Sequence, residues 1–285
     1  MAAFSQRQWA AISVGVLFFA SLYFINCKPP QPIGAKAPTR SNSHAGPAIS
    51  MDSILSEARF GVPVYVKNRI NKIMEAMRRS NAAVNAALLD SVINIYDSAG
   101  AQLPAALYTE KLAALKNSTG LWYRAGHIYY RTAEVVNADA HQALLQRAMQ
   151  CFDNSLKLDS NNLEAAVGKG ECIVEGAGNP MEGIMMIEGV LKKDSNNEKA
   201  QVALGRFSIQ SGQNAKAIHR FNKVLKIDPA YSEAYLYLAQ ASQNSGDTNA
   251  AIAYLKKYST FVRDTTVKNQ VNSYILKLEN NKTGQ

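Results

Sequence analysis

The chain has 285 residues, of which 47% are hydrophobic and 8% aromatic, so it can bury a core and is not wholly disordered. Its formal net charge of +9 is unevenly spread, because residues 28–120 carry 11 Lys/Arg against 6 Asp/Glu, whereas residues 121–285 carry 19 against 16. Anionic lipid or a partner could be attracted to the first of these stretches. No Lys/Arg run contains interleaved aromatic residues, so nucleic acid is not an expected partner.

A transmembrane anchor is predicted at residues 9–27, after a short N-terminal tail of residues 1–8. The run from Trp9 to Ile25 has 17 uncharged residues, long enough to cross a bilayer with help from its flanks. Two alternatives stay open: a cleaved signal peptide, which usually has a shorter apolar core, and lipidation at Cys27. We expect a single-pass membrane protein, but the flanking charges are too few to predict which side holds the rest of the chain.

Residues 28–50 contain five prolines among Gly, Ser and Asn, and they show no apolar periodicity. This composition predicts a flexible linker that holds the following domain away from the membrane. The short motif Pro29-x-x-Pro32 also allows an alternative, a proline-rich ligand for another module.

Residues 51–118 are predicted to be a helical region without a clear repeat. Apolar residues recur there at helical spacing, and Pro63 divides the first part. The expected helices are Ser53–Phe60, Val64–Arg79, Asn85–Ser98 and Pro104–Lys116. The last two are joined through Gly100 and could form a degenerate repeat, with Leu89, Ala99 and Leu112 as packing positions.

A repeat of 34 residues organises the rest of the chain and is clearest when Gly212 is aligned with Gly246. The alignment pairs Leu204 with Leu238, Gly205 with Ala239, Ala217 with Ala251 and Phe221 with Leu255. Small residues at the paired inner positions allow two helices to approach closely, and the two glycines suit turns that need a positive φ. Further back, Leu156–Asn162 and Leu191–Asn197 are near copies, 35 residues apart.

This period and pattern resemble the tetratricopeptide repeat (TPR) family, as does Trp122-x-x-Ala125-Gly126-x-x-Tyr129. The resemblance implies an all-α fold, a right-handed α-solenoid of helix-turn-helix repeats with four units over residues 119–263. About ten extra residues in the first unit should lengthen a helix or a loop. Residues 264–285 should form a capping helix, which Asp264-Thr265-Thr266 can start, and a frayed tail from Glu279.

The resemblance also implies a concave groove, lined by the first helix of each repeat, that binds a protein or peptide partner. The positions that correspond to the outward face of these helices are Tyr123, Arg124, His127, Tyr130, Arg131, Glu171, Val174, Glu175, Lys199, Arg206, Gln210, Tyr237, Gln240, Gln243 and Asn244. Any single one of them could instead be an ordinary solvated side chain. The Lys and Asn that clamp acidic peptide tails in some relatives are replaced here, for example by Val202 and Arg206. The groove positions instead alternate in charge, basic at Arg124 and Arg131, acidic at Glu171 and Glu175 and basic again at Arg206, so a mixed-charge partner is expected.

No arrangement of residues predicts catalysis, a metal site or a cofactor site. The four histidines are not at metal-ligand spacing from one another or from a cysteine, and Gly168-x-Gly170 lies within an expected helix and is a packing feature. Cys151 and Cys172 fall on neighbouring helices, where they could pair in a disulfide or, more commonly, remain as buried thiols.

The sequence therefore predicts a membrane-anchored, non-catalytic TPR scaffold that binds a protein or peptide partner in its groove. One alternative is a structural or assembly subunit of a cell-envelope complex, which would use the edges of the solenoid. An enzyme with an unrecognised site is a third, weaker alternative.

Overall fold

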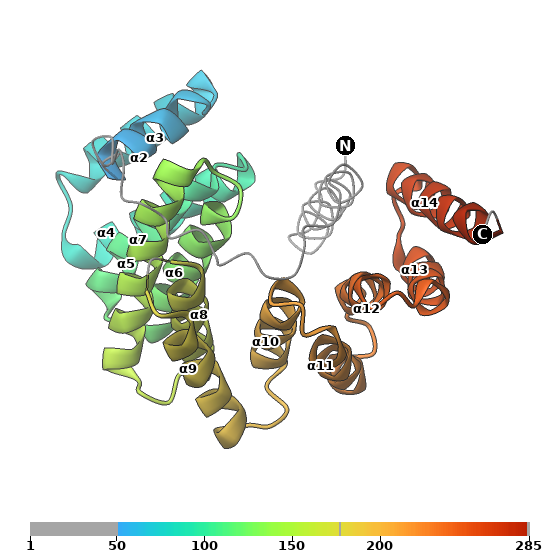
Figure 1. Ribbon diagram of the computed structural model, residues 1–285. Coiled ribbons are helices and arrows are strands. Elements are labelled where there is room, and N and C mark those ends of the chain that lie inside the picture. The colour runs from blue at the N-terminus through green and yellow to red at the C-terminus, as the bar shows by residue number, and fades with distance from the viewer. Residues whose placement is uncertain (1–50, 177, 284–285) are drawn as a thin grey trace, which may run out of the picture. The chain divides into compact units, whose positions relative to one another are not determined.

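The computed structural model describes residues 51–176 and 178–283, and all regular secondary structure in these ranges is α-helix (Figure 1). These residues divide into two compact units at Ala200 and Gln201, and each unit is treated by itself below. The predicted anchor at residues 9–27 and linker at residues 28–50 lie outside the described residues. The prediction of an all-α protein made of helix pairs is confirmed for the part of the chain that is described.

The first unit contains helices that pack mainly against their neighbours in sequence. They are α2 (Met51–Phe60), α3 (Val64–Met77), α4 (Ala82–Ser98), α5 (Gln102–Lys116), α6 (Thr119–Ala133), α7 (Ala138–Leu158), α8 (Leu163–Glu175) and α9 (Pro180–Lys193). Helix α10 (Glu198–Gln210) begins at the end of this unit and continues into the second. The second unit also holds α11 (Asn214–Ile227), α12 (Glu233–Asn244), α13 (Thr248–Phe261) and α14 (Thr265–Thr283).

The two near-copied segments of the sequence are turns between helix pairs, with the same side-chain caps in both. Asp159 and Asp194 each accept a hydrogen bond from the backbone N–H two residues later, at 2.9 and 3.0 Å. Asn162 and Asn197 then accept from the third residue of α8 and of α10, both at 3.0 Å. These bonds satisfy N–H groups that lack partners within the helix, so the repeated Asp-x-x-Asn fixes where each new pair begins.

Glycines with positive φ make the turns within helix pairs, as the sequence predicted. Gly212 and Gly246 have φ of 73° and 81°, and Gly100 has φ of 70°. A residue with a Cβ rarely adopts this conformation, which explains why glycine recurs where a first helix must reverse into a second.

Gly100 also gives the register of the degenerate repeat. Ala99 directly follows α4 and packs, partly buried, against the core that α3, α4 and α5 form, as predicted. With Gly100 aligned on Gly212, the counterparts of Leu204 and Ala217 are Val92 and Ala105, and both are fully buried. Leu89 and Leu112 are buried as expected, but they lie outside the aligned positions. The α4–α5 pair therefore resembles the later repeats more closely than its sequence suggests.

The core of the second unit depends on a close approach between α10 and α11. A Cβ on Gly205 would lie only 2.7 Å from the ring of Phe221, so the glycine makes room for that ring. Tyr237 of α12 stacks on the same ring, with centroids 4.7 Å apart. The prediction that a small residue at Gly205 allows two helices to approach closely is confirmed.

In the first unit, Phe152 of α7 has the equivalent role for two helices at once. Cβ atoms on Gly126 and Gly168 would both approach its ring within 2.9 Å, so the ring lies against α6 and α8 together. This contact confirms that Gly168 is a packing residue. The ten extra residues of this repeat mainly lengthen the second helix, because α7 has 21 residues against 14 for α11.

Helix α14 covers the end of the second unit. Val271, Ile275 and Leu278 are buried against α13 and α12, and Asp264 accepts hydrogen bonds from the first turn of the helix. The prediction of a frayed tail from Glu279 is wrong for its first residues, because the helix continues to Thr283. An ion pair between Lys256 and Glu279, 2.8 Å long, ties this last stretch to α13.

Cys151 and Cys172 are free and buried, so the alternative of a disulfide between them is not what the structure shows. Burial raises the pKa of both thiols, which keeps them protonated and chemically quiet.

No helix within residues 51–283 is both long and apolar enough to cross a membrane.

The close contact of Gly205 leads to a test of the repeat packing. Gly205→Leu should lower the free energy of unfolding by about 1–3 kcal/mol, because the added side chain overlaps the Phe221 ring. The same replacement at Gly189, where a Cβ would meet nothing within 4 Å, should have no effect or increase stability. Urea denaturation of both variants measures the difference. An equal loss of stability in the two variants would contradict a close approach of α10 and α11 at Gly205.

Candidate functional site

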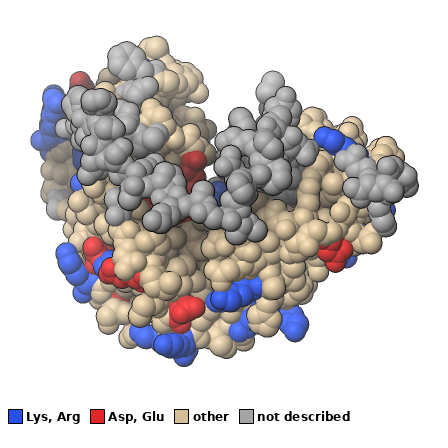
Figure 2. Space-filling model, in the orientation of Figure 1, with Lys and Arg blue, Asp and Glu red and all other residues tan. Residues whose placement is uncertain are grey.

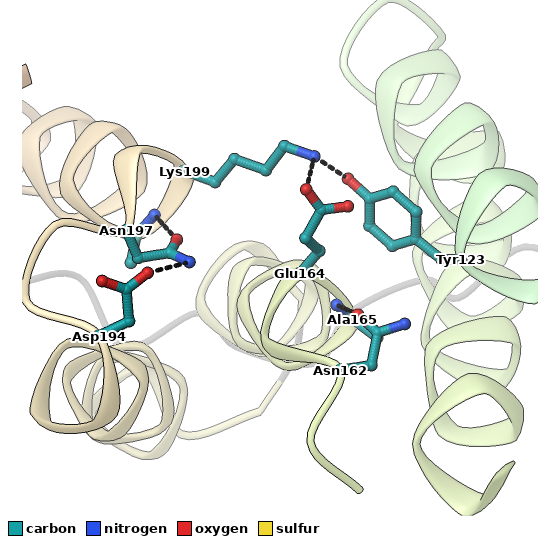
Figure 3. Close-up of polar contacts among 8 residues, drawn as sticks. Tyr123, Asn162, Glu164, Ala165, Asp194, Asn197 and Lys199 are labelled. Carbon is teal, nitrogen blue, oxygen red and sulfur yellow. Dashed lines mark hydrogen bonds and ion pairs between the residues drawn. The ribbon is translucent and has the colours of Figure 1, made fainter. Parts of the chain in front are cut away.

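Three side chains from successive first helices meet in the first unit, and we call them the first-helix cluster: Tyr123, Glu164 and Lys199 (Figure 3). The Lys199 ammonium donates hydrogen bonds to Tyr123 Oη and to Glu164 Oε1, both at 2.7 Å. Figure 3 shows Lys199 extending from the start of α10 across α8 to the ring on α6. The cluster therefore joins α6, α8 and α10 through polar contacts rather than through core packing.

The repeat itself explains why Glu164 and Lys199 meet. Each stands two residues after the asparagine that caps its helix, Asn162 in one case and Asn197 in the other. Equivalent positions of successive repeats lie side by side in a stack of helix pairs. Glu164 was not predicted from the sequence. The 35-residue spacing of the two capped turns could have predicted it, because this spacing places Glu164 and Lys199 at equivalent positions of successive repeats.

The first-helix cluster remains open to solvent. The side chains of Lys199 and Glu164 are 46% and 49% exposed, so their ion pair adds little to stability and both groups remain accessible to a partner. Lys199 also lies 4.8 Å from the centre of the Tyr123 ring, a cation–π geometry. One face of the unit thus presents a cation, a carboxylate and an aromatic ring within reach of one another.

Protonation states in the cluster follow from these contacts. Burial raises the pKa of the Tyr123 phenol, and the hydrogen bond from Lys199 only partly offsets that effect. Partial burial opposes the charge on Lys199, but its bonds to Glu164 and Tyr123 outweigh this and raise its pKa. At neutral pH the tyrosine is therefore neutral and the lysine charged, which suits recognition by hydrogen bonds and charge.

His127 lies one turn beyond Tyr123 on α6, with the two ring centroids 5.9 Å apart. Its side chain keeps contact with water, yet surrounding protein atoms lower its pKa below the usual value, and the charges of Arg131 and Lys199 lower it further. The ring is consequently neutral at pH 7 and can both donate and accept a hydrogen bond. This places the predicted groove residues Tyr123, His127 and Lys199 together.

Other predicted groove residues of α6 have structural partners. Tyr130 is only 2% exposed and donates a hydrogen bond to Glu175 of α8 at 2.8 Å, so it belongs to the core and not to an open face. Arg124 pairs with Asp97 of α4, and Arg131 pairs with Glu134 of its own helix at 2.7 Å. The two arginines therefore already have carboxylate partners within the unit.

Glu171 and Val174 are partly buried on α8, and the remaining candidates lie in the second unit, where they are considered separately. Arg206 is partly buried and Gln210 exposed on α10; Tyr237 and Gln240 are partly buried and Asn244 exposed on α12. One face of the Tyr237 ring stacks on Phe221. Gln243 accepts a hydrogen bond from Tyr274 of α14 at 2.9 Å.

An interior polar network supports α6 from the opposite direction and was not predicted. Arg147 of α7 binds both carboxylate oxygens of Glu110 of α5, at 2.7 and 3.0 Å, and Tyr129 of α6 donates to the same carboxylate at 3.1 Å. Burial raises the pKa of Tyr129, which therefore stays a donor. Residues far apart in sequence make this network, so periodicity alone could not reveal it.

Within the residues that the structure describes, no group of three or more His, Cys, Asp or Glu side chains could hold a metal ion. The first-helix cluster offers hydrogen bonding, ion pairing and contact with an aromatic ring.

Known sequences relate the second unit to one repeat family. Residues 208–267 match a family model described as tetratricopeptide repeat, so the chain contains repeats of this type. No curated protein matches the chain.

Solved structures show the same architecture over more of the chain. A tetratricopeptide repeat protein from Parabacteroides merdae ATCC 43184 is 15% identical, with a TM-score of 0.56 over 82% of this chain and 88% of that one. This likeness identifies the fold as an all-α stack of TPR helix pairs. YrrB, described as a TPR protein with an unusual peptide-binding site, is 16% identical over 70% of this chain and 97% of its own, with a TM-score of 0.41. MamA from Desulfovibrio magneticus RS-1 is 20% identical over 62% and 94%, with a TM-score of 0.44.

The environment of His127 can be tested by titration. In NMR spectra of the imidazole protons, His127 should titrate below its usual pKa of 6.5, and Lys199→Ala should raise the value because one neighbouring cation is removed. Added salt should raise the pKa of His127 only part of the way towards 6.5. Salt screens the neighbouring cations but does not change how far protein atoms surround the ring. A pKa at or above 6.5 in the wild type would show that the ring is not held in this environment.

Proposed function

We propose that this TPR protein is a non-catalytic scaffold that binds a protein or peptide partner through the first-helix cluster of α6, α8 and the start of α10. The observation that carries the proposal is the half-exposed ion pair of Glu164 and Lys199 next to Tyr123. Side chains that a fold needs for stability are normally buried, whereas this pair joins three helices at a surface open to solvent.

The cluster suits a partner with both polar and charged groups. Lys199 can accept a further carboxylate, Glu164 can accept N–H donors, and Tyr123 supplies a rigid ring with a hydroxyl. Because the two charges are of opposite sign and already close, a uniformly acidic or basic ligand would meet one repulsive group. A mixed-charge segment lying across successive first helices fits the arrangement better.

We further propose that residues 9–27 anchor the chain in a membrane and that residues 28–50 act as a linker. The support is the uncharged run from Trp9 to Ile25 and the five prolines that follow it.

Charge reversal tests the binding surface. Lys199→Glu should remove most partner protein from pull-downs with the purified chain, because it places two carboxylates where the partner meets a cation and a carboxylate. The melting temperature should change little, since the exposed ion pair contributes about 0–1 kcal/mol to stability. Partners recovered by the wild type are identified by mass spectrometry and compared across variants.

Two matched variants make the result specific. Lys192→Glu applies the same charge change to an exposed position of α9, a second helix, and should retain the partners. The exchange Glu164→Lys with Lys199→Glu restores an ion pair in the opposite order and should preserve folding without restoring binding. Unchanged partners with Lys199→Glu would place the binding surface elsewhere on the chain.

The membrane proposal has its own test. The full chain should stay in the membrane pellet after carbonate extraction, and removal of residues 1–27 should release it to the supernatant. Incorporation of labelled palmitate that disappears in Cys27→Ser would instead support lipidation.

A further inference from the structure

Helix α11 of the second unit carries a continuous basic face, defined by Lys216, His219, Arg220, Lys223 and Lys226. These residues recur at i, i+3, i+4, i+7 and i+10, a spacing that places them on one side of a helix. No Asp or Glu occurs in α11, and none occurs anywhere between Glu198 and Asp228. The charge is therefore uniform over the whole length of the helix.

The core fixes the direction of this face. The opposite side of α11 is fully buried against α12 through Ala217, Phe221 and Val224. The Phe221 ring also lies next to Gly205 of α10. Rotation of the helix would expose these three side chains, so the basic residues cannot turn inward. Packing of the repeat determines that these positions of α11 face away from the core. It requires only that they be polar, so it does not explain why they are all basic.

The lysines of the basic face are not neutralised within the described parts of the chain. Lys216 and Lys226 are exposed, Lys223 is half-buried, and none of the three makes an ion pair there. Lys216 donates instead to the neutral amide of Gln213. An incoming carboxylate would thus gain an interaction without displacing an acidic side chain from these lysines.

The basic face is hollowed near its N-terminal end. Gln201, Ala215, Lys216, His219, Arg220 and Lys223 line a shallow depression of about 500 Å³. Arg220 reaches across it to the Gln201 side-chain oxygen, at 3.3 Å. Figure 2 shows Lys and Arg side chains gathered at the lower centre of the surface, over α11. A carboxylate side chain entering the depression would meet cations on several sides.

The surroundings favour a protein over other anionic partners. None of the large hydrophobic side chains exposed on the described surface belongs to α11, so the helix has no apolar group to insert into a bilayer. Phe221, the one Phe, Tyr or Trp of the helix, is fully buried and cannot stack on a base, which leaves the exposed His219 as the ring on this face. Ten residues of helix span about 15 Å, a length that matches three or four acidic side chains of a peptide.

We propose that the basic face of α11 docks an acidic segment of a partner protein, at a surface separate from the first-helix cluster. The two surfaces belong to different units and differ in charge pattern, one mixed and one uniformly basic. A scaffold with both could hold two partners, or two parts of one partner.

The test measures binding of a fluorescein-labelled oligoglutamate peptide to the full chain in neutral detergent by fluorescence anisotropy. The wild type should bind, and added salt should weaken binding because the contacts are exposed ion pairs. Lys216→Glu with Lys223→Glu should weaken binding about tenfold or more. Circular dichroism of the variant should remain unchanged, since the replaced side chains do not enter the core.

The control variant Lys268→Glu with Lys277→Glu makes the same change in net charge at exposed positions of α14 and should bind like the wild type. Equal weakening by both pairs would overturn the proposal, because binding would then follow net charge alone. Unchanged binding in the α11 pair would overturn it as well.

The same assay distinguishes other anionic ligands. If the wild type bound vesicles containing anionic lipid, or a single-stranded oligonucleotide, more tightly than the oligoglutamate peptide, that class of ligand would replace the acidic protein segment as the proposed partner. The Lys199→Glu variant should retain peptide binding, so failure here and failure of the proposed first-helix surface can be told apart.

Discussion

The close approach of helices at glycine is the constraint on which the rest of this structure depends. Phe152 fits only because Gly126 and Gly168 carry no side chain beside it, and Phe221 fits for the same reason beside Gly205. Interiors are packed densely enough that one added methyl group at such a position has to move a ring. The α6–α7 and α10–α11 pairs are therefore each held by a ring on the second helix and a glycine on the first, whereas α8–α9 uses Gly170 and Ile187.

Other helix faces carry the two proposed binding surfaces, and the two surfaces arise in different ways. The first-helix cluster forms because equivalent positions of successive repeats lie side by side, which brings Glu164 to Lys199 and both to Tyr123. The basic face of α11 forms along one helix, from residues a turn apart. One surface thus depends on the stacking of repeats and the other on a single helix, so substitutions can alter one without the other.

Polar side chains have distinct structural tasks in this chain. Glu110, 15% exposed, holds Arg147 and Tyr129 and connects α5, α6 and α7, while the Asp-x-x-Asn turns determine where α8 and α10 begin. The pair of Glu164 and Lys199 is about half exposed and contributes little to stability. This contrast is the physical reason for assigning recognition to the first-helix cluster and architecture to the other polar groups.

The sequence by itself determined the helix pairs, their 34-residue period, the glycine turns and the close helix approach at Gly205, because these follow from spacing and from the shape of single residues. It also predicted Tyr123, His127 and Lys199 as members of one surface. Only the tertiary structure decided that Tyr130 is buried, that Arg124 and Arg131 have carboxylate partners, and that Glu164 completes the cluster. The reason is that periodicity specifies which face of a helix is buried, whereas the partners of Arg124 and Lys199 lie 27 to 76 residues away in the chain, and a local pair such as Arg131 and Glu134 depends on how the helix ends.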